Sequence, residues 1–198
     1  MAAPSSSGHS AAAAALDSRV QRAVGTRRWT GSWYTEFVTV DRQGGAGADP
    51  AFRAELAAEL EPYRMAGSDV VVQPPAYVPL DIGLTVYVAA GYFRGTVKLA
   101  LIEAFSARDL PGGDRGFFHP DNFTFATPVY LSRVIAAAMT VAGIARVDAV
   151  TFQRFGQPPA GELAAGLIAK ARLEVARCDS EATDPAAGRI SFDMTGGL

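Results

Sequence analysis

The residues of this sequence that could do chemistry are few, and the most suggestive group surrounds one histidine. The chain contains two histidines, His9 and His119, and His9 lies in an Ala- and Ser-rich N-terminal stretch. His119-Pro120-Asp121 matches the H-x-D half of a non-haem iron triad, which needs a second histidine to complete its set of ligands. No other histidine or cysteine lies near His119 in the sequence. A structural turn is therefore favoured over a metal site, and a small metal-dependent enzyme using His119 and Asp121 is an alternative.

Other reactive arrangements are missing from the sequence. Cys178 is the only cysteine, so no internal disulfide or CxxC pair can form. There is no serine in a G-x-S-x-G elbow, no phosphate-binding P-loop and no G-x-G-x-x-G fingerprint. Glu59 and Glu61 form the best carboxylate pair, but residues two apart on a helix do not face each other. We therefore expect no catalytic, cofactor-binding or metal-binding residues and no enzymatic activity.

The composition is that of a globular protein without a strong electrostatic preference. Hydrophobic residues make up 49% of the chain and charged residues 19%, and the formal net charge is −2. A net charge this small does not favour nucleic acid or an anionic membrane. No apolar run reaches the roughly 18 residues that would cross a bilayer. We expect neither a nucleic-acid partner nor direct insertion into a membrane.

Aromatic residues are concentrated in two segments whose apolar surface must be buried. The loop 117–125 holds four phenylalanines in nine residues, and each ring can bury roughly 150–250 Å². The loop either folds back onto its own core, which is the favoured alternative, or docks on a neighbouring subunit. Two tryptophans beside two arginines, in the segment 27–33, pose the same choice. The candidate interface residues are Trp29, Trp33, Arg115, Phe117, Phe118 and Phe123.

Local patterns in the first half predict alternating helices and strands. Asp17 and Ser18 can cap a short helix that runs through Val24. The β-forming residues of segment 32–40 predict a central strand. Asp49-Pro50 is typical of a helix start, and the residues that follow on one face are Phe52, Leu56, Leu60 and Tyr63.

The second half predicts further strands and helices around the aromatic loop. Short and alternating apolar runs predict strands at 70–72, 80–88 and 146–152, and helices at about 93–107 and from Pro128 onward. Residues 162–171 favour a helix, and two arms near 173–175 and 190–194 favour a hairpin joined by the loop 179–188. The fold class is therefore α+β, a mixed sheet of strand–helix–strand units with helices packed on it and a C-terminal β-hairpin arm. The expected divisions are a disordered leader at 1–18, one domain at 19–155, and a linker with the β-arm at 156–198.

Several segments in the same order resemble the baseplate J-like family of baseplate assembly proteins. Segments 28–34, 60–67, 78–82 and 91–94 are similar to stretches of that family. The strongest similarity lies in 109–113 and 116–132, and the last six residues, 193–198, also fit. The resemblance spans residues 20–198 and covers the C-terminal portion of the family's longer proteins.

The resemblance implies a mechanical role without cofactors. It implies a wedge component in the baseplate of a contractile, phage-tail-like injection system, with no catalytic residues to carry over. Its expected partners are other wedge subunits, hub or spike proteins, sheath or tube proteins, and copies of itself in a six-fold assembly. It would assemble in the bacterial cytoplasm into a particle that can be released outside the cell. A stand-alone adaptor that tethers another protein is the remaining alternative.

Overall fold

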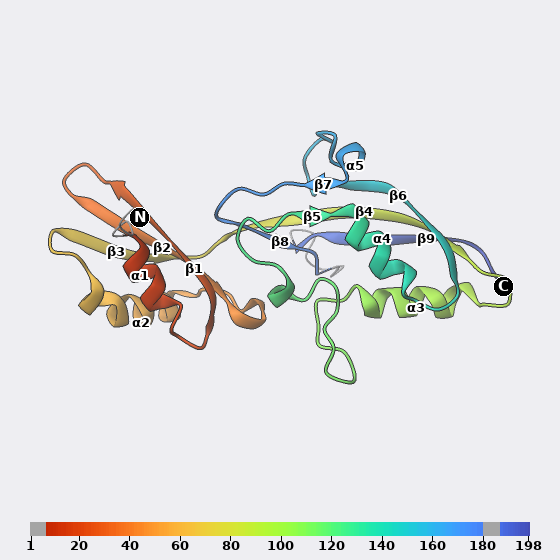
Figure 1. The fold of residues 1–198 in the computed structure, drawn as a ribbon, viewed down its shortest axis with the longest axis horizontal. Coiled ribbons are helices and arrows are strands. Elements are labelled where there is room, and N and C mark those ends of the chain that lie inside the picture. Colours follow the sequence, from red (N-terminus) through yellow and green to blue (C-terminus); the bar gives the residue numbers. More distant parts are fainter. Residues whose placement is uncertain (1–6, 180–186) are drawn as a thin grey trace, which may run out of the picture. The chain divides into compact units, whose positions relative to one another are not determined.

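The protein folds into two compact units. The structure is a computed structural model that describes residues 7–179 and 187–198. The N-terminal unit comprises residues 1–76 and the C-terminal unit residues 77–198. This boundary falls inside the segment 19–155, for which the sequence predicts a single domain. Both units combine helices with strands (Figure 1), which confirms the predicted α+β class.

The N-terminal unit is a three-stranded sheet with two helices. Its elements are α1 (Ser7–Ala14), β1 (Val20–Trp29), β2 (Tyr34–Arg42), α2 (Pro50–Leu60) and β3 (Ser68–Gln73), with short 3-10 turns η1 (Gln43–Gly45) and η2 (Glu61–Tyr63). The sheet order is β1-β2-β3; β1 and β2 are antiparallel, and β2 and β3 are parallel. As predicted for segment 32–40, β2 is the central strand.

Helix α1 lies where the sequence predicts a disordered leader. Residues 1–6 of that leader fall outside the described residues. Further along it, Ala11 and Ala14 are buried, and Ser10 Oγ donates a 2.8 Å hydrogen bond to Glu36 Oε2 beneath the helix. Alanine favours the helical state and lets a helix approach a sheet closely. The low-complexity composition therefore gave the wrong prediction for residues 7–14.

The predicted helix from Asp17 to Val24 is also wrong. Asp17 caps no helix, because its carboxylate accepts hydrogen bonds from the backbone N–H and the guanidinium of Arg19. From Val20 onward the chain pairs with β2, and Gly25 lies within the strand opposite Val38. Pairing along the full length of β2 overrides the local capping signal, whose strength is only about 1 kcal/mol.

The core of the N-terminal unit lies between α2 and the sheet. As predicted, Asp49 caps α2 by accepting from the backbone N–H of Phe52, and Pro50 occupies the first helical position. The helix buries Phe52, Leu56 and Leu60 against apolar residues of the sheet, Val20, Val38, Val40 and Val72. Each buried side chain contributes roughly 1.5–3 kcal/mol. Tyr63 does not share this face, because the chain tightens into η2 after Leu60.

The C-terminal unit is organised around the long strand β4 (Ala76–Val88). β6 (Ile144–Arg154) pairs antiparallel with β4 on one side; β8 (Glu174–Arg177) and β9 (Arg189–Gly196) also adjoin it. The predicted alternation is confirmed, since the inward residues Leu80, Ile82, Leu84, Val86 and Val88 are all buried. A separate two-stranded sheet joins β5 (Val129–Tyr130) to β7 (Leu167–Ile168).

Helices cover this sheet and differ from the predictions in length. α3 (Arg94–Ala104) packs against β9, and α4 (Leu131–Met139) against β6. The latter begins three residues later than predicted, because residues 129–130 pair with β7 instead. α5 (Glu162–Ala165) is a single turn, since Gly166 adopts a left-handed φ of 66° and ends it.

The C-terminal hairpin differs from its prediction in the partner of its second arm. β9 pairs in parallel with β4, from Asp81↔Arg189 to Val88↔Gly196. Arg189 adds a bidentate ion pair to Asp81, with contacts of 2.7 and 3.1 Å. Most of the predicted connecting loop, residues 180–186, lies outside the described residues; at its ends, the Asp179 N–H donates to the Ala187 carbonyl. The predicted arm is therefore a strand of the main sheet.

Candidate interaction site

Residues 29–34, where β1 turns into β2, form what we call the hairpin tip. Strand pairing continues to the last possible pair, Trp29↔Tyr34. Thr30 closes the turn, because its backbone N–H and its Oγ1 both donate to the Trp33 carbonyl, at 3.0 and 2.9 Å. Gly31 has a φ of 105°, a conformation open mainly to glycine. These contacts hold the tip in one conformation.

The structure brings the two predicted tryptophans together on this tip. The Trp29 ring meets the Tyr34 ring edge-on with centroids 5.2 Å apart, and Trp33 Nε1 donates to Asp69 Oδ2 at the start of β3. Both tryptophans remain open to solvent, with exposed fractions of 59% and 51%. Aromatic rings that are oriented by neighbours and left uncovered are typical of protein interfaces.

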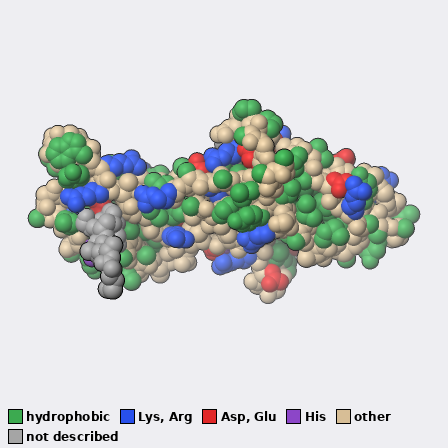
Figure 2. Space-filling model, turned by 45° about the horizontal axis from the view of Figure 1, so that its top comes forward, with side chains coloured by type: hydrophobic (Ala, Val, Ile, Leu, Met, Phe, Trp, Pro, Cys, Tyr) green, Lys and Arg blue, Asp and Glu red, His purple; other side chains and the backbone are tan. Residues whose placement is uncertain are grey.

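Two arginines flank the aromatic residues of the hairpin tip. The Arg27 guanidinium lies 4.3 Å from the centroid of the Tyr34 ring, and that of Arg28 lies 5.0 Å from the Phe37 ring. Stacking on an aromatic face orients a guanidinium while leaving its edge for other contacts. Figure 2 shows hydrophobic side chains beside Lys and Arg side chains over this part of the N-terminal unit.

The phenylalanine-rich loop belongs to the core of the C-terminal unit. Phe118 and Phe123 are 3% and 5% exposed, and Phe117 is half-buried. Their rings lie with centroids 4.9–6.0 Å apart and contact Phe105 at the end of α3. The structure therefore has the fold-back arrangement, and neither Phe118 nor Phe123 presents a surface to a partner.

Arg115 is exposed, but its guanidinium forms ion pairs with two carboxylates of the segment 109–121. Its Nη2 lies 3.0 Å from Asp121 Oδ2, and its Nε lies 3.9 Å from Asp109 Oδ1. An isolated β-bridge joins Asp109 to Arg115. These contacts join Arg115 to Asp109 before it and to Asp121 after it. This candidate interface residue therefore stabilises its own segment of the chain.

His119 also has a structural task. Its imidazole is buried, and Nδ1 accepts a 3.2 Å hydrogen bond from the backbone N–H of Asp121, which caps the 3-10 turn η3 (Pro120–Asn122). Nε2 lies 3.4 Å from Asp109 Oδ1. The lone pair of Nδ1 is thereby engaged. Within residues 7–179 and 187–198, no group of three or more His, Cys, Asp or Glu side chains is arranged to hold a metal ion.

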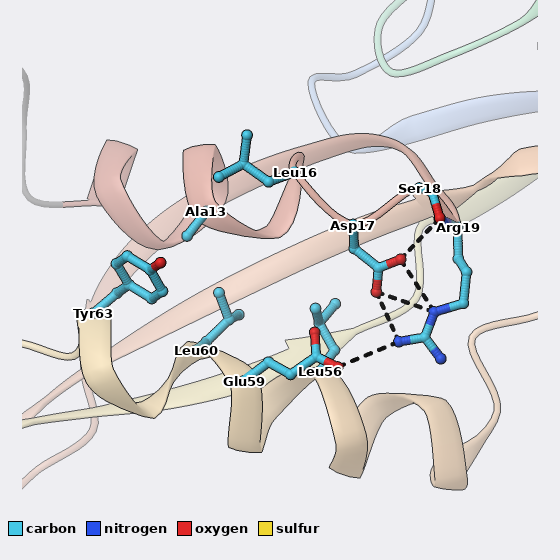
Figure 3. A pocket seen from close by; sticks show the side chains of 9 residues that line it. All are labelled: Ala13, Leu16, Asp17, Ser18, Arg19, Leu56, Glu59, Leu60 and Tyr63. Carbon is cyan, nitrogen blue, oxygen red and sulfur yellow. Dashed lines mark hydrogen bonds and ion pairs between the residues drawn. The ribbon is translucent and has the colours of Figure 1, made fainter.

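A cleft between α1 and α2 is a feature that sequence reasoning missed. Its volume is about 420 Å³, and Figure 3 shows the side chains that line it. Apolar walls come from Ala13, Leu16, Leu56, Leu60 and Tyr63, and the polar lining from Asp17, Ser18, Arg19 and Glu59. No sequence pattern indicates this cleft, because Leu16 falls in the predicted leader and Tyr63 on a face predicted to be buried.

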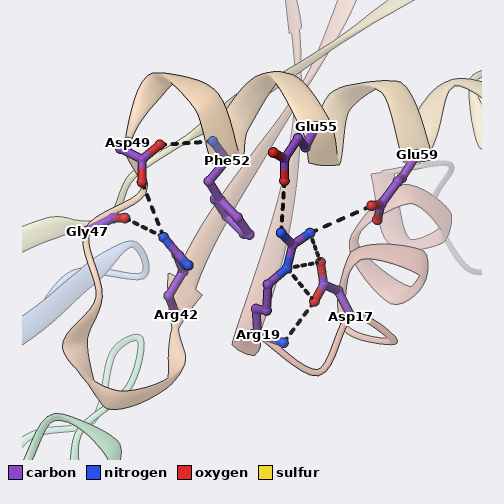
Figure 4. Close-up of polar contacts among 8 residues, drawn as sticks. All are labelled: Asp17, Arg19, Arg42, Gly47, Asp49, Phe52, Glu55 and Glu59. Carbon is purple, nitrogen blue, oxygen red and sulfur yellow. Dashed lines mark hydrogen bonds and ion pairs between the residues drawn. The ribbon is translucent and has the colours of Figure 1, made fainter.

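Arg19 is the centre of the charges beside this cleft (Figure 4). Its guanidinium contacts Asp17 at 2.7 Å, Glu55 at 2.9 Å and Glu59 at 3.6 Å. The hydrogen bond from Arg19 lowers the pKa of the Asp17 carboxyl, and the same bond raises the pKa of Arg19. Three carboxylates thus converge on one guanidinium, and the Arg42 guanidinium stacks on the same Phe52 ring as that of Arg19.

Among the described side chains of the C-terminal unit, Lys170 has a pKa that lies far from its ordinary value. Its Nζ is buried without a hydrogen-bond partner among the described residues and lies 5.4 Å from the centroid of the Phe123 ring. Burial, which disfavours the ammonium, lowers the pKa of Lys170 to about 8, although nearby Glu174 opposes this shift. Glu174 is itself held by Arg154 at 2.8 Å.

This burial predicts a pH-dependent stability that Lys170→Met removes. The pKa of Lys170 is about 8 in the folded chain and near 10.5 when exposed, so the unfolded state binds more protons between these values. The free energy of unfolding should therefore rise between about pH 8 and 10, and the cost of burial is fully present below pH 8. We expect Lys170→Met to flatten this slope and to add about 1–2 kcal/mol at pH 7. Urea unfolding of both chains at pH 7 and pH 10 tests this; equal slopes would contradict it.

Comparison with known proteins assigns the N-terminal unit to a family. Residues 9–73 match the family model described as the Baseplate J-like central domain. The match supports the resemblance seen in the sequence motifs of this segment, and the N-terminal unit is similar to that family's central domain. The match begins within the predicted leader, which agrees with α1 as part of the folded domain. A comparison with curated proteins finds no match.

The match supports a structural role in a phage baseplate, in contact with other baseplate or tail proteins. The hairpin tip lies within the matched segment, whereas the phenylalanine-rich loop lies outside it. In the part of the chain that the structure describes, no helix is long and apolar enough to cross a membrane.

Proposed function

We propose that the protein is a wedge component of the baseplate of a contractile, phage-tail-like injection system, and that the hairpin tip docks on a neighbouring subunit. The observation that carries this proposal is the exposure of Trp29 and Trp33 on a turn held by hydrogen bonds. An ordered tip loses little conformational entropy on binding, so most of the energy of aromatic burial is retained. Oriented tryptophans and arginines are the residue types that dominate protein interfaces.

The expected partners are other wedge subunits, hub or spike proteins, and sheath or tube proteins. Repeated copies in a six-fold baseplate would place the hairpin tip at each of several equivalent junctions. Assembly in the bacterial cytoplasm, before any release of the particle, is consistent with a chain whose single cysteine, Cys178, is buried and forms no disulfide.

No contact favours the alternative of a metal-dependent enzyme at His119 and Asp121. The imidazole Nδ1 accepts from a backbone N–H, and the Asp121 carboxylate lies 3.0 Å from the Arg115 guanidinium. Both groups are thus engaged by protein partners. The stand-alone adaptor is distinguished by its partners, because an adaptor would bind its target without any other baseplate protein.

The docking role predicts that Trp33→Ala weakens binding without unfolding the chain. Removal of an interface tryptophan typically costs at least about 2 kcal/mol, roughly a 30-fold rise in Kd. The free energy of unfolding should fall by no more than about 1 kcal/mol, because the ring is half exposed and the hydrogen bond lost to Asp69 lies at the surface. Particle assembly and binding to purified baseplate proteins are the measurements.

The matched control is Phe93→Ala, which removes an exposed ring from the C-terminal unit. It should leave both binding and stability unchanged. Wild-type binding by Trp33→Ala and by Trp29→Ala would refute the docking role of the hairpin tip.

A further inference from the structure

The two tryptophans of the hairpin tip face opposite sides of the N-terminal sheet. Trp29 is paired directly with Tyr34, and directly paired residues share a face. Side chains of β2 alternate between the faces, so this is also the face that packs against α2. Thr35 lies on the other face, and its neighbour in β3 is Asp69, which accepts a hydrogen bond from Trp33. The two rings therefore offer separate contacts.

The Trp33 ring is fixed by a residue from outside the hairpin. Its Nε1 donates to Asp69 Oδ2, from a position 36 residues earlier in the chain. Asp69 is itself held by the parallel pairing of β3 with β2, which lies beside it (Figure 1). The turn thus fixes the backbone at Trp33, and β3 fixes the side chain. A ring that is already oriented loses less conformational entropy when it docks.

The same hydrogen bond determines what a partner has to provide for this ring. Indole has one hydrogen-bond donor and no acceptor, and Asp69 already engages that donor. What Trp33 leaves open to solvent, at an exposed fraction of 51%, is therefore mainly its apolar ring. A buried N–H without an acceptor is costly, but this N–H enters an interface together with its acceptor. The complementary surface needs apolar groups and no acceptor of its own.

We infer that Asp69 is the positioning residue of the docking site, and that the partner receives Trp33 in an apolar slot with no acceptor for the indole N–H. The inference rests on the proposed docking role of the hairpin tip and adds the chemistry of its receptor. Asp69 is exposed at the start of β3, so it stays at the margin of the contact and acts through the orientation of the ring.

Substitutions at Asp69 test the positioning role. The probe is a baseplate particle assembled without this chain, to which the purified full-length chain is added. Asp69→Ala should weaken binding at least about fivefold, the lower end of the cost of a buried donor without an acceptor. Asp69→Asn keeps an oxygen acceptor and should bind within about threefold of the wild type. The matched control is Glu103→Ala, which removes an exposed carboxylate of α3 and should bind as the wild type does.

Fluorescence of the free chain gives a readout that a merely structural role would not move. Trp29→Phe leaves Trp33 as the single tryptophan of the chain. In this background, Asp69→Ala should speed the local decay of Trp33 fluorescence anisotropy, whereas Asp69→Asn should not. Circular dichroism verifies that both chains are folded. An anisotropy decay that Asp69→Ala leaves unchanged would overturn the positioning role.

A double-mutant cycle tests the apolar slot. In the wild type, Trp33→Phe shrinks the ring and leaves the Asp69 carboxylate without its donor, so binding should weaken. In the Asp69→Ala chain, the same substitution removes an N–H that the slot cannot satisfy, so it should cost less or restore part of the lost affinity. A partner that supplies its own acceptor would make Trp33→Phe at least as costly in the Asp69→Ala chain, and that result would overturn the slot.

The outcomes separate this inference from the proposed function. If Trp33→Ala weakens binding while Asp69→Ala binds as the wild type does, the tip docks without this positioning and only the inference fails. If Trp33→Ala and Trp29→Ala both bind as the wild type does, the docking role itself fails, and the inference fails with it.

Discussion

Replacing Phe118 with alanine should destabilise the C-terminal unit by about 3–5 kcal/mol, the range for removal of a buried phenylalanine. The ring is 3% exposed and lies among Phe105, Phe117 and Phe123, so the cavity left behind cannot fill with solvent or collapse without moving other rings. Urea unfolding followed by circular dichroism measures the loss. Both tryptophans lie in the N-terminal unit, so their fluorescence reports separately on that unit and should change little.

The same variant tests whether Phe118 has a second role in docking. Core packing predicts that assembly is lost only in proportion to stability and returns at lower temperature. Phe93→Ala is the matched control, because that ring is exposed in the same unit. A folded, stable Phe118→Ala chain that fails to assemble would contradict the core assignment.

Gly188→Ala should be comparably damaging, for a reason that lies in the backbone. Gly188 has a φ of 82°, and an added Cβ would lie 2.6 Å from the Arg177 carbonyl oxygen and 2.7 Å from the Leu80 nitrogen. These are main-chain atoms of β8 and β4, so no rotamer change relieves the contact. We expect a loss of about 3–5 kcal/mol, from the clash together with the left-handed conformation.

Gly95→Ala, in the same unit, should stabilise the protein instead of destabilising it. Gly95 lies in α3, and a Cβ added there meets no atom within 4 Å. Alanine should therefore stabilise the helix by about 0.5–1 kcal/mol. Thermal unfolding of both variants and the wild type measures the expected loss of stability in one and the expected gain in the other. A Gly188→Ala chain as stable as Gly95→Ala would refute the close approach of Gly188 to the main chains of β4 and β8.

Elements whose signals are local could be predicted from the sequence. α2 carries its own cap at Asp49, proline at its first position and apolar residues at helical spacing. The alternation along β4 likewise records that one face of the strand is buried. In both cases the neighbouring residues alone determine which side faces the core.

Elements that depend on distant partners could not be predicted. β1 begins with a helix-capping pattern, and only its pairing with β2 makes it a strand. The parallel pairing of β9 with β4 leaves no trace in either segment, since alternation is the same whichever strand lies alongside. α1 was hidden because its buried residues are alanine and serine, which carry little hydrophobic signal.

The sequence indicates aromatic candidates for the interaction site, and only the structure separates the exposed tryptophans from the buried phenylalanines. Trp29 and Trp33 are candidate interface residues in the sequence, and the turn at Gly31 explains why they come together. The fate of the phenylalanine-rich loop required the tertiary structure, because both burial and docking satisfy the same composition. The cleft required it as well, since its walls come from α1 and from the end of α2, which are far apart in the sequence.

The parallel pairing of β9 with β4 has a consequence for folding during translation. Arg189 and Asp81 are 108 residues apart, so the stretch of β4 from Asp81 to Val88 lacks its β9 partner until the ribosome has finished β9. The N-terminal unit closes its sheet with β3, which ends at Gln73, and can fold while the rest is still being made. The nascent chain thus carries a finished first unit and an incomplete second one, whose bare strand edge is open to wrong partners until synthesis passes β9.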